Sequence, residues 1–331
     1  MPVTSHDVAR LAGVSQPTVS RALRDQRAVS ALTRAKVREA ARALGYVPSQ
    51  SGRTLSTRTT RRVGVVSAEL GNPFYPALLE PLHDALAEHG YRTILITDRG
   101  DVPVEVEQLI DGSLDGAVLT TSGLDSTLPQ ELDRRGLPYV MLNRVVLGVA
   151  GDVCASDNHA SGAIAADFLL ELGHRRIAAV HGPDTTSTGR ERAIAFHERL
   201  AEHGISVPDR WVHRGPFAEA TGRRALAELM TADDAPTAVF CGNDVIAMGV
   251  CNGAREVGIG VPSELTVIGI DDIPMAAWPV FDLTTLRTDL GVLALGAADL
   301  LVGRMRNPGL APREVRLAPE LVRRGTHAPP A

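Results

Sequence analysis

Beyond residue 62, short apolar runs alternate along the chain with longer stretches in which apolar residues recur every three or four positions. An uninterrupted apolar run is typical of a strand buried on both faces of a parallel sheet, and the wider spacing is typical of an amphipathic helix. The expected strands are RVGVVSA, YRTILIT, DGAVLTT, PYVMLN, RRIAAVHG, TAVFCGND and ELTVIGIDD. The expected helices are Pro76–His89, Ala160–Leu172, Arg190–His203, Ala218–Met230 and Val245–Val257.

This alternation predicts an α/β fold of doubly wound parallel sheets. The expected strands are too many for one such sheet, so we expect two lobes. Many of the strands end in polar residues, and ligands bind at the carboxyl ends of strands in sheets of this kind. A ligand site is therefore expected where those ends meet.

The first sixty residues show a different pattern, that of three short helices. Thr4 or Ser5 can cap the first helix, and Gly13 can take the left-handed conformation that a tight reversal needs. Ser15 can cap the second helix, in whose first turn Pro17 costs little. The positions expected to face inward on these two helices are Val8, Ala9, Leu11, Ala12, Val19, Ala22 and Leu23.

The third helix is expected to follow Ser30 as its cap and to stop before Pro48. Its expected inward positions are Leu32, Val37, Ala40, Ala41 and Leu44. Residues 49–62, SQSGRTLSTRTTRR, are polar and basic with Leu55 as their only large apolar residue, so they predict a linker. The chain is thus expected to comprise a head (1–48), a hinge linker (49–61) and a body (62–331).

Charge divides along the same boundary. The whole chain has a net charge of −5, but residues 1–62 hold 12 Lys and Arg against 3 Asp and Glu, a net of +9. The remainder carries 22 basic and 36 acidic residues, a net of −14. Such asymmetry is typical of a polyanion-binding arm on an acidic body, although a solvated basic face without a partner would look the same.

Two helices joined by a glycine turn, as in DVARLAGVSQPTVSRAL, predict a helix-turn-helix whose second helix enters the major groove of DNA. Its outward polar face would present Gln16, Thr18, Ser20 and Arg21. Arg pairs bidentately with guanine, Gln pairs with adenine, and hydroxyls suit phosphate oxygens. A three-helix cap with no nucleic-acid role is the alternative.

Other classes of protein find less support. No apolar run approaches the roughly 18–20 residues of a membrane helix, and MPVTSHD is not a signal peptide. The three cysteines lack metal-ligand spacing, and Cys241 and Cys251 are expected to be buried thiols in a reducing cytoplasm. GPDTTSTGR lacks the Gly-Lys-Ser/Thr ending of a phosphate loop, and HERLAEH is not a zinc motif, so His197 and His203 are expected on the surface. We therefore expect no enzyme, no cofactor and no metal.

Several long motifs, in order, carry a resemblance that covers practically the whole chain. DVARLAGVSQPTVSRAL and the following LTRAKVREAARALGYVPS are very similar to the lactose-repressor-like (LacI/GalR) family of bacterial transcriptional regulators. The likeness continues through NPFY, LNR, GNDVIAMG, VPSELTVIGIDD and LTTLRTD. The chain departs from the family at Arg24, where members often have Asn. It also has Gln16-Pro17 at positions that help to set operator preference, so its operator sequence cannot be inferred from that of any relative.

The resemblance implies a set of DNA-binding residues. They are Thr4, Ser15, Gln16, Pro17, Thr18, Ser20, Arg21, Arg24, Ser30, Tyr46, Ser49, Arg53 and Leu55. In the family the linker folds into a hinge helix on operator DNA and inserts a leucine into the minor groove, and Leu55 stands at that position. Gly52 weakens this helix by about 0.5–1 kcal/mol relative to Ala. A plain tether is the alternative role for the linker.

The body then resembles periplasmic sugar-binding proteins, whose interleaved lobes close around a small polar ligand. The chain would cross between the lobes near residues 157, 289 and 319. The implied effector-binding residues are Asn72, Phe74, Tyr75, Asp98, Arg144, Thr188, Arg192, Phe217, Asn243, Asp271 and Thr288. Asp271 and Asn243 could instead cap the structure that follows them.

The function expected is that of a cytoplasmic, nucleoid-associated repressor. A homodimer would bind an inverted-repeat operator, and a small polar effector, a sugar, would switch its affinity. A corepressor or a nucleoside effector remains an alternative, as does, more distantly, an α/β enzyme that processes small molecules. The tail has no leucine heptads, which argues against a tetramer built on a coiled coil.

Overall fold

The computed structural model describes residues 3–23, 28–47, 59–97, 106–231 and 234–330. These residues fall into two compact units, Met1–Thr60 and Arg61–Ala331. We call them the head and the body and describe each by itself.

The head packs three helices, α1 (Ser5–Ala12), α2 (Gln16–Leu23) and α3 (Ala31–Ala43), around one small core. The helix ends follow the sequence signals. Thr4 and Asp7 form a reciprocal capping box on α1, Gly13 has a φ of 65°, and the Ser30 hydroxyl accepts a hydrogen bond from the Thr33 amide at 3.2 Å. The side chains that fill the core are Val8, Ala9, Val19, Ala22, Val29, Val37, Ala40 and Ala41.

Two of the expected inward residues of the head are in fact exposed. Leu11 is 56% exposed and Leu32 is 70% exposed. Helical residues advance by about 100° each, so Leu11 lies beside the stripe formed by Val8 and Ala12, and Leu32 lies on a different face from Val37. Helices this short bury only a narrow stripe, and these two leucines fall outside it.

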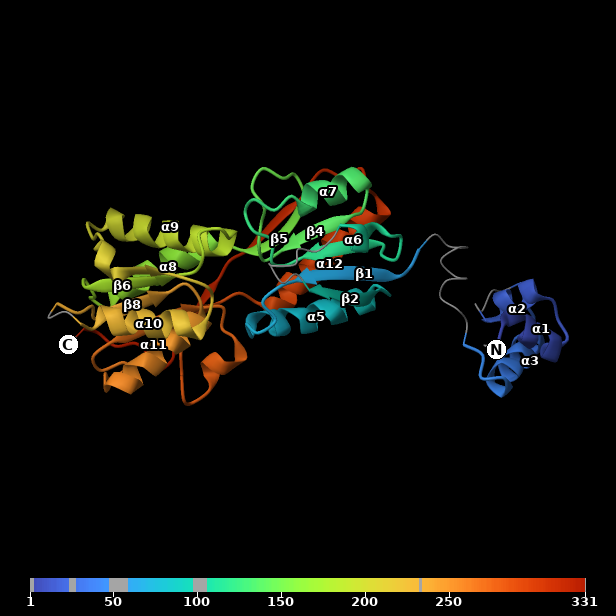
Figure 1. Cartoon of the computed structure of the whole chain (residues 1–331), viewed down its shortest axis with the longest axis horizontal. Coiled ribbons are helices and arrows are strands. Elements are labelled where there is room, and N and C mark those ends of the chain that lie inside the picture. The colour runs from blue at the N-terminus through green and yellow to red at the C-terminus, as the bar shows by residue number, and fades with distance from the viewer. Residues whose placement is uncertain (1–2, 24–27, 48–58, 98–105, 232–233, 331) are drawn as a thin grey trace. The chain divides into compact units, whose positions relative to one another are not determined.

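The body contains two six-stranded sheets, each in its own lobe (Figure 1). The first sheet has the order β11-β5-β4-β3-β1-β2 and is parallel throughout. Its strands are β1 (Arg62–Ser67), β2 (Arg92–Thr97), β3 (Gly116–Leu119), β4 (Tyr139–Leu142), β5 (Asp152–Ser156) and β11 (Glu314–Leu317). Its helices are α5 (Phe74–Glu88), α6 (Glu107–Ile110), α7 (Leu128–Arg135) and α12 (Leu290–Arg306).

The second sheet has the order β12-β10-β9-β8-β6-β7, with only β12 antiparallel to its neighbour. Its strands are β6 (Ile177–His181), β7 (Val212–Arg214), β8 (Ala238–Cys241), β9 (Thr266–Ile270), β10 (Thr284–Arg287) and β12 (Glu320–Val322). Its helices are α8 (Asn158–Glu171), α9 (Ser187–Glu202), α10 (Glu219–Leu229), α11 (Asp244–Val257) and two short 3₁₀ turns, Asp209–Trp211 and Pro274–Ala277. The doubly wound α/β fold in two lobes is confirmed.

The chain passes between the lobes three times. It leaves the first sheet after β5, returns after β10 to form α12, and leaves again between β11 and β12. The two lobes are therefore joined side by side by three segments, at residues 157, 288–289 and 318–319. Such a connection allows one lobe to rotate against the other while both sheets stay intact.

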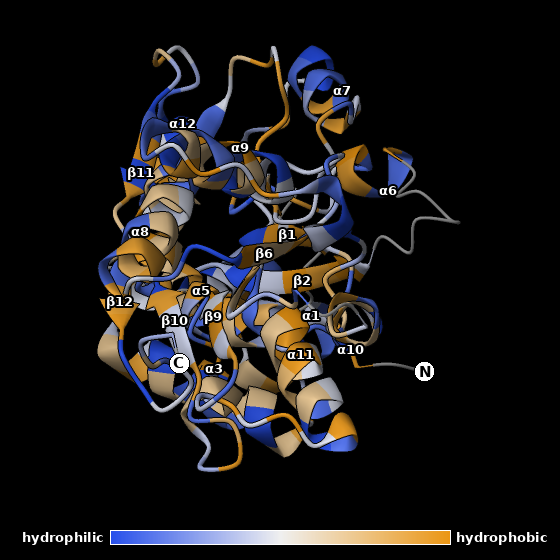
Figure 2. Cartoon of the chain, turned by 90° about the vertical axis from the view of Figure 1, so that its left-hand side faces the viewer, coloured by the Kyte–Doolittle hydropathy of each residue, from blue (hydrophilic) through white to orange (hydrophobic). Residues whose placement is uncertain are grey.

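All seven expected strands are present, but one of them is not buried. In β2, Ile94 is 38% exposed and Leu95 is 46% exposed, because β2 is the edge strand of the first sheet. Figure 2 shows the hydrophobic colour along this strand. The strands missed were β5, β7, β10, β11 and β12, which are short and mix polar with apolar residues, so that no apolar run marks them.

Close packing of α8 against α9 fixes the position of Arg192. A Cβ atom on Gly162 of α8 would lie 2.4 Å from the Arg192 carbonyl oxygen and 2.9 Å from the Phe196 amide nitrogen, both in α9. Only glycine lets the two backbones approach this closely. The same device joins α10 to α11, where a Cβ on Gly222 would lie 2.0 Å from the Ile246 carbonyl oxygen.

Gly162→Ala is expected to lower the free energy of unfolding by about 1–3 kcal/mol, as overpacked cores do. The direction of this change is informative, because replacing glycine by alanine in a helix interior ordinarily stabilises a protein by about 1 kcal/mol. A loss of stability would therefore reflect the close approach of the two helices. Urea unfolding of the full chain measures the difference. Gly309→Ala is the control, since the nearest neighbour of its Cβ would be 3.8 Å away. A Gly162→Ala protein as stable as wild type would contradict the packing argument.

Candidate functional site

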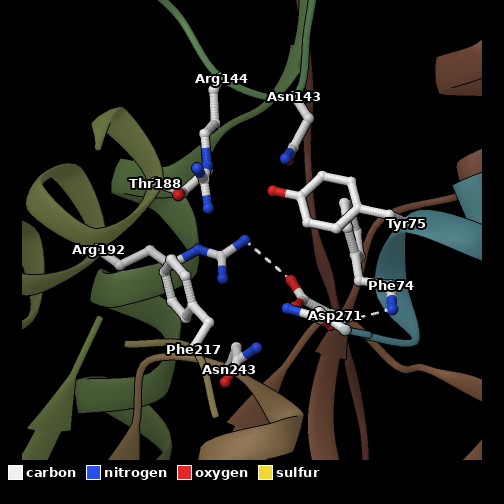
Figure 3. A pocket seen from close by; sticks show the side chains of 10 residues that line it. Phe74, Tyr75, Asn143, Arg144, Thr188, Arg192, Phe217, Asn243 and Asp271 are labelled. Carbon is white, nitrogen blue, oxygen red and sulfur yellow. Dashed lines mark hydrogen bonds and ion pairs between the residues drawn. The ribbon is translucent and has the colours of Figure 1, made fainter. Parts of the chain in front are cut away.

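A small cavity lies between the lobes, lined by residues of both. Figure 3 shows their side chains converging on it. The lining residues are Asn72, Phe74, Tyr75, Asn143, Arg144, Thr188, Arg192, Phe217, Asn243 and Asp271. The structure thus brings together all but two of the effector-binding residues predicted from sequence.

The two exceptions differ from each other. Asp98 lies outside the described residues. Thr288 is absent from the lining and sits instead on the second crossing segment, where its hydroxyl accepts a hydrogen bond from the Ser156 hydroxyl at 2.8 Å. The prediction missed Asn143, which follows β4 with a φ of 71°. Its place between the apolar run of β4 and Arg144 was a signal that could have found it.

All three side-chain nitrogens of Arg192, in the cavity wall, donate hydrogen bonds. Its Nη2 donates to Asp271 Oδ1 at 2.9 Å, its Nε donates to Asn158 Oδ1 at 2.9 Å, and its Nη1 donates to the Gly242 carbonyl at 2.8 Å. Both members of the ion pair are almost fully buried. Burial raises the pKa of Asp271, and the neighbouring Arg192 guanidinium opposes that rise.

A second arginine reaches the cavity from the other lobe. Arg144 Nη2 donates to Glu69 Oε1 at 3.2 Å, and Nη1 donates to the Thr121 carbonyl at 3.2 Å. Its guanidinium carbon lies 5.9 Å from the centre of the Tyr75 ring and 5.8 Å from that of Phe217. The Nε of Arg144 is buried without a hydrogen-bond partner among the described residues.

Aromatic rings form the apolar part of the wall. Phe74 and Tyr75 pack edge to face at 5.4 Å, and burial raises the pKa of the Tyr75 hydroxyl, which stays protonated. Phe217 lies against Gly182, where a Cβ would come within 2.2 Å of the ring. Asn243 also caps α11, since its Oδ1 accepts from the Ile246 amide at 3.0 Å, so the capping role considered for this residue exists beside its place in the cavity.

The head offers a partly polar surface on α2. Arg21 and Pro17 are exposed, while Gln16, Thr18 and Ser20 are partly exposed. Gln16 Nε2 donates to the Ser5 hydroxyl at 3.2 Å, which holds its amide on the helix surface. Ser15 and Thr18 pair through their hydroxyls at 2.8 Å, and Tyr46 packs partly against the core. Four predicted DNA-binding residues lie outside the described residues: Arg24, Ser49, Arg53 and Leu55.

The comparisons with known proteins address both parts of the chain. Residues 4–49 match the bacterial regulatory proteins of the lacI family, and residues 166–327 match the periplasmic binding protein-like domain. The ribose operon repressor of Escherichia coli (strain K12) is 32% identical over 330 residues, which cover 98% of this chain and 99% of that repressor. The chain belongs to the LacI family of bacterial regulatory proteins.

Solved structures of transcriptional regulators are also similar to this chain. A complex of the transcriptional regulator CelR with cellobiose is 32% identical, covers 98% of this chain and 99% of that one, and has a TM-score of 0.75. A LacI family regulator from Enterococcus faecium with bound ribose is 28% identical, covers 81% of this chain and 99% of that one, and has a TM-score of 0.73. This LacI-family protein is a DNA-binding regulator switched by a small effector, and its family is one of regulators rather than enzymes.

Three further features concern the part of the chain that the structure describes. There, no cluster of three or more His, Cys, Asp or Glu side chains could hold a metal ion. No helix within the described ranges is long and apolar enough to cross a membrane. Cys154, Cys241 and Cys251 are buried free thiols, as expected for the last two.

The expectation that His197 lies on the surface was wrong. His203 is exposed, but His197 is half-buried, with its Nε2 2.9 Å from that of His181. His181 ends β6, next to the glycine on which Phe217 packs, and is fully buried. Burial, together with His197 and Arg214, lowers the pKa of His181 to about 3. The pair is held neutral because a proton there would be buried beside another cation.

Acid should therefore destabilise the body through His181. An unfolded histidine has a pKa of about 6.5, so between pH 6.5 and about 3 the unfolded chain binds a proton that the folded chain rejects. The contribution is complete above pH 6.5 and is lost as the pH falls, by up to about 1.4 kcal/mol per pH unit. His181→Asn should remove this part of the slope.

Urea unfolding between pH 7 and pH 5 measures the effect. His203→Gln, at the exposed histidine, serves as the control and should keep the wild-type slope. An equal pH dependence in wild type and His181→Asn would show that the buried pair does not carry it.

Proposed function

We propose that this protein is a homodimeric repressor of inverted-repeat operators, released by a neutral monosaccharide bound between its lobes. The observation that carries the proposal is the buried Arg192–Asp271 pair, 2.9 Å apart, in a cavity also lined by aromatic rings. Sugar hydroxyls accept from and donate to such fixed groups, and the apolar face of a sugar ring stacks on an aromatic side chain.

The charges of the cavity favour an uncharged ligand. Arg192 faces Asp271, and Arg144 faces Glu69, so each guanidinium in the wall already meets a carboxylate. Among the described residues, a sugar phosphate would meet no guanidinium in the wall that lacks a carboxylate partner, and burying its uncompensated charge would be costly. A neutral sugar carries no charge that the wall would have to balance, and it needs only hydrogen bonds from polar lining residues.

The compared regulators favour one sugar ring. The relative from Escherichia coli is a ribose operon repressor, and the regulator from Enterococcus faecium was solved with ribose, which agrees with a pentose. CelR was solved with cellobiose, so the family also accommodates larger sugars.

The head supplies the DNA contacts in this proposal. Residues 1–62 carry a net charge of +9, which suits a phosphate backbone, and the residues on α2 predicted to contact DNA lie at its surface. One recognition helix contacts too few base pairs for useful specificity, so two heads of a homodimer would read adjacent major grooves. Leu55 would enter the minor groove between them. The protein would act in the cytoplasm, on the nucleoid.

A ligand panel tests the sugar. Isothermal titration of the full chain with D-ribose, D-glucose, ribose 5-phosphate, adenosine and cellobiose should show binding of a neutral monosaccharide. A ligand at a hundred times its Kd should add about 2.7 kcal/mol to the free energy of unfolding. Arg192→Ala should abolish binding and keep DNA binding, and Arg199→Ala, further along the same helix, should change neither. Binding of adenosine or ribose 5-phosphate alone would overturn the ligand class.

DNA selected by the full chain from a random duplex library tests the operator. The selected sequences should form an inverted repeat, and affinity should fall steeply with salt. Leu55→Ala should weaken binding roughly tenfold, the factor expected when a buried leucine side chain is lost, whereas Leu147→Ala in the body should not. An unchanged operator affinity in Leu55→Ala would rule out the insertion of Leu55 into the minor groove. Stronger DNA binding with sugar present would identify a corepressor.

A further inference from the structure

A continuous chain of hydrogen bonds leads from the cavity to the crossing segments. Asp271 and Arg192 form its first link, and Arg192 Nε donates to Asn158 Oδ1 at 2.9 Å. Asn158 Nδ2 then donates to Glu191 Oε2 at 3.2 Å, and Arg316 Nη1 donates to the same carboxylate oxygen at 3.1 Å. Each member thus contacts the next through an oriented bond.

The last link joins the two lobes. Glu191 belongs to α9, which packs with the second sheet, whereas Arg316 belongs to β11, a strand of the first sheet. The other members, Asn158, Arg192 and Asp271, belong to the second lobe. Rotation of one lobe against the other must therefore lengthen or reorient the contact between Glu191 and Arg316.

Arg316 also reaches the point where the crossing segments meet. Its Nη1 donates to the Ser156 carbonyl at 3.3 Å, and the Ser156 hydroxyl donates to Thr288 at 2.8 Å. Ser156 ends β5 before the first crossing, Thr288 lies on the second crossing, and Arg316 lies just before the third. One arginine is thereby connected to all three.

The connecting residues have little freedom to respond independently. Asn158 is fully buried, and its amide is fixed because its oxygen accepts from Arg192 while its nitrogen donates to Glu191. The Glu191 and Arg316 side chains are 22% and 28% exposed, so their ion pair is only partly screened by water. A guanidinium is rigid and planar, so a ligand that shifts Arg192 also moves the Asn158 amide.

We propose that the contacts Asp271–Arg192–Asn158–Glu191–Arg316 transmit occupancy of the cavity to the crossing segments, with Glu191 and Arg316 setting the angle between the lobes. This rests on the proposed function, because it takes the effector to bind at Arg192. Glu191 and Arg316 are positioning residues that need not touch the ligand. The differential contact that a ligand makes with Arg192 would bias the lobes toward one orientation.

Hydrogen exchange of the full chain without ligand gives the first test. Glu191→Gln should speed exchange in peptides covering 152–158, 284–290 and 314–320 by roughly tenfold, the effect of losing one charge-assisted hydrogen bond. Arg316→Gln should do the same and covers the case in which the first variant does not fold. Glu314→Gln is the matched control, because it removes the other carboxylate bonded to Arg316, at 2.7 Å within the first lobe.

Asp271→Asn tests whether the chain of contacts is connected. It should speed exchange in the peptide 314–320, which lies in the other lobe. Changes confined to the surroundings of residues 243 and 271 would overturn the proposal. So would equal exchange in Glu191→Gln and Glu314→Gln.

The second test adds D-ribose. Wild type should bind it and gain protection in the crossing peptides, whereas Glu191→Gln should bind it within about threefold of the wild-type Kd and gain none. The transmission role would be overturned if Glu191→Gln gained as much protection from exchange as wild type does. Loss of sugar binding in Glu191→Gln would also overturn it. If wild type does not bind D-ribose, the pentose assignment fails, and the ligand-free exchange experiment still decides the proposal.

Discussion

The buried guanidinium of Arg192 imposes the strictest requirement in this protein. A charge removed from water is tolerated only where charged and polar groups surround it, and here Asp271, Asn158 and the Gly242 carbonyl meet its three nitrogens. Asn158 begins α8, whereas Gly242 and Asp271 directly follow β8 and β9 of the second lobe. Any ligand that engages Arg192 therefore acts on a part of the lobe that is already fixed, and its contacts cannot be absorbed by a loose side chain.

The interleaved path of the chain places Arg192 and its partners near the segments that join the two lobes. Because the chain crosses between the lobes three times, the lobes can rotate but cannot separate. The glycine contact between α8 and α9 holds Arg192 close to Asn158 at the first crossing. The cavity and the hinge are consequently neighbours in space, and a small change at one is felt at the other through few contacts.

The DNA-binding part of the chain and the cavity differ in how their charges are arranged. The head and linker are strongly basic, which suits a polyanion, whereas the cavity pairs each of its two guanidiniums with a carboxylate. The first arrangement suits the phosphates of any duplex, and the second leaves both guanidiniums of the cavity wall beside an opposite charge. A LacI-family regulator needs both within one chain, and an acidic body limits unspecific contact between the body and DNA.

The resemblance to the LacI family indicated most of the cavity lining. Local sequence determined the fold class, the seven strands marked by apolar runs, and the caps of α1 and α3. It could do so because apolar runs, caps and polar residues at strand ends act over a few neighbouring residues. Only the tertiary structure decided that β2 is an edge strand, that Leu11 and Leu32 are exposed, and that Asn143 faces the cavity while Thr288 does not. The same holds for Glu191 and Arg316, which lie 125 residues apart and meet only because two lobes share three crossings. Periodicity in a sequence reports which face of an element is apolar, but it carries no record of the distant partner that will cover that face.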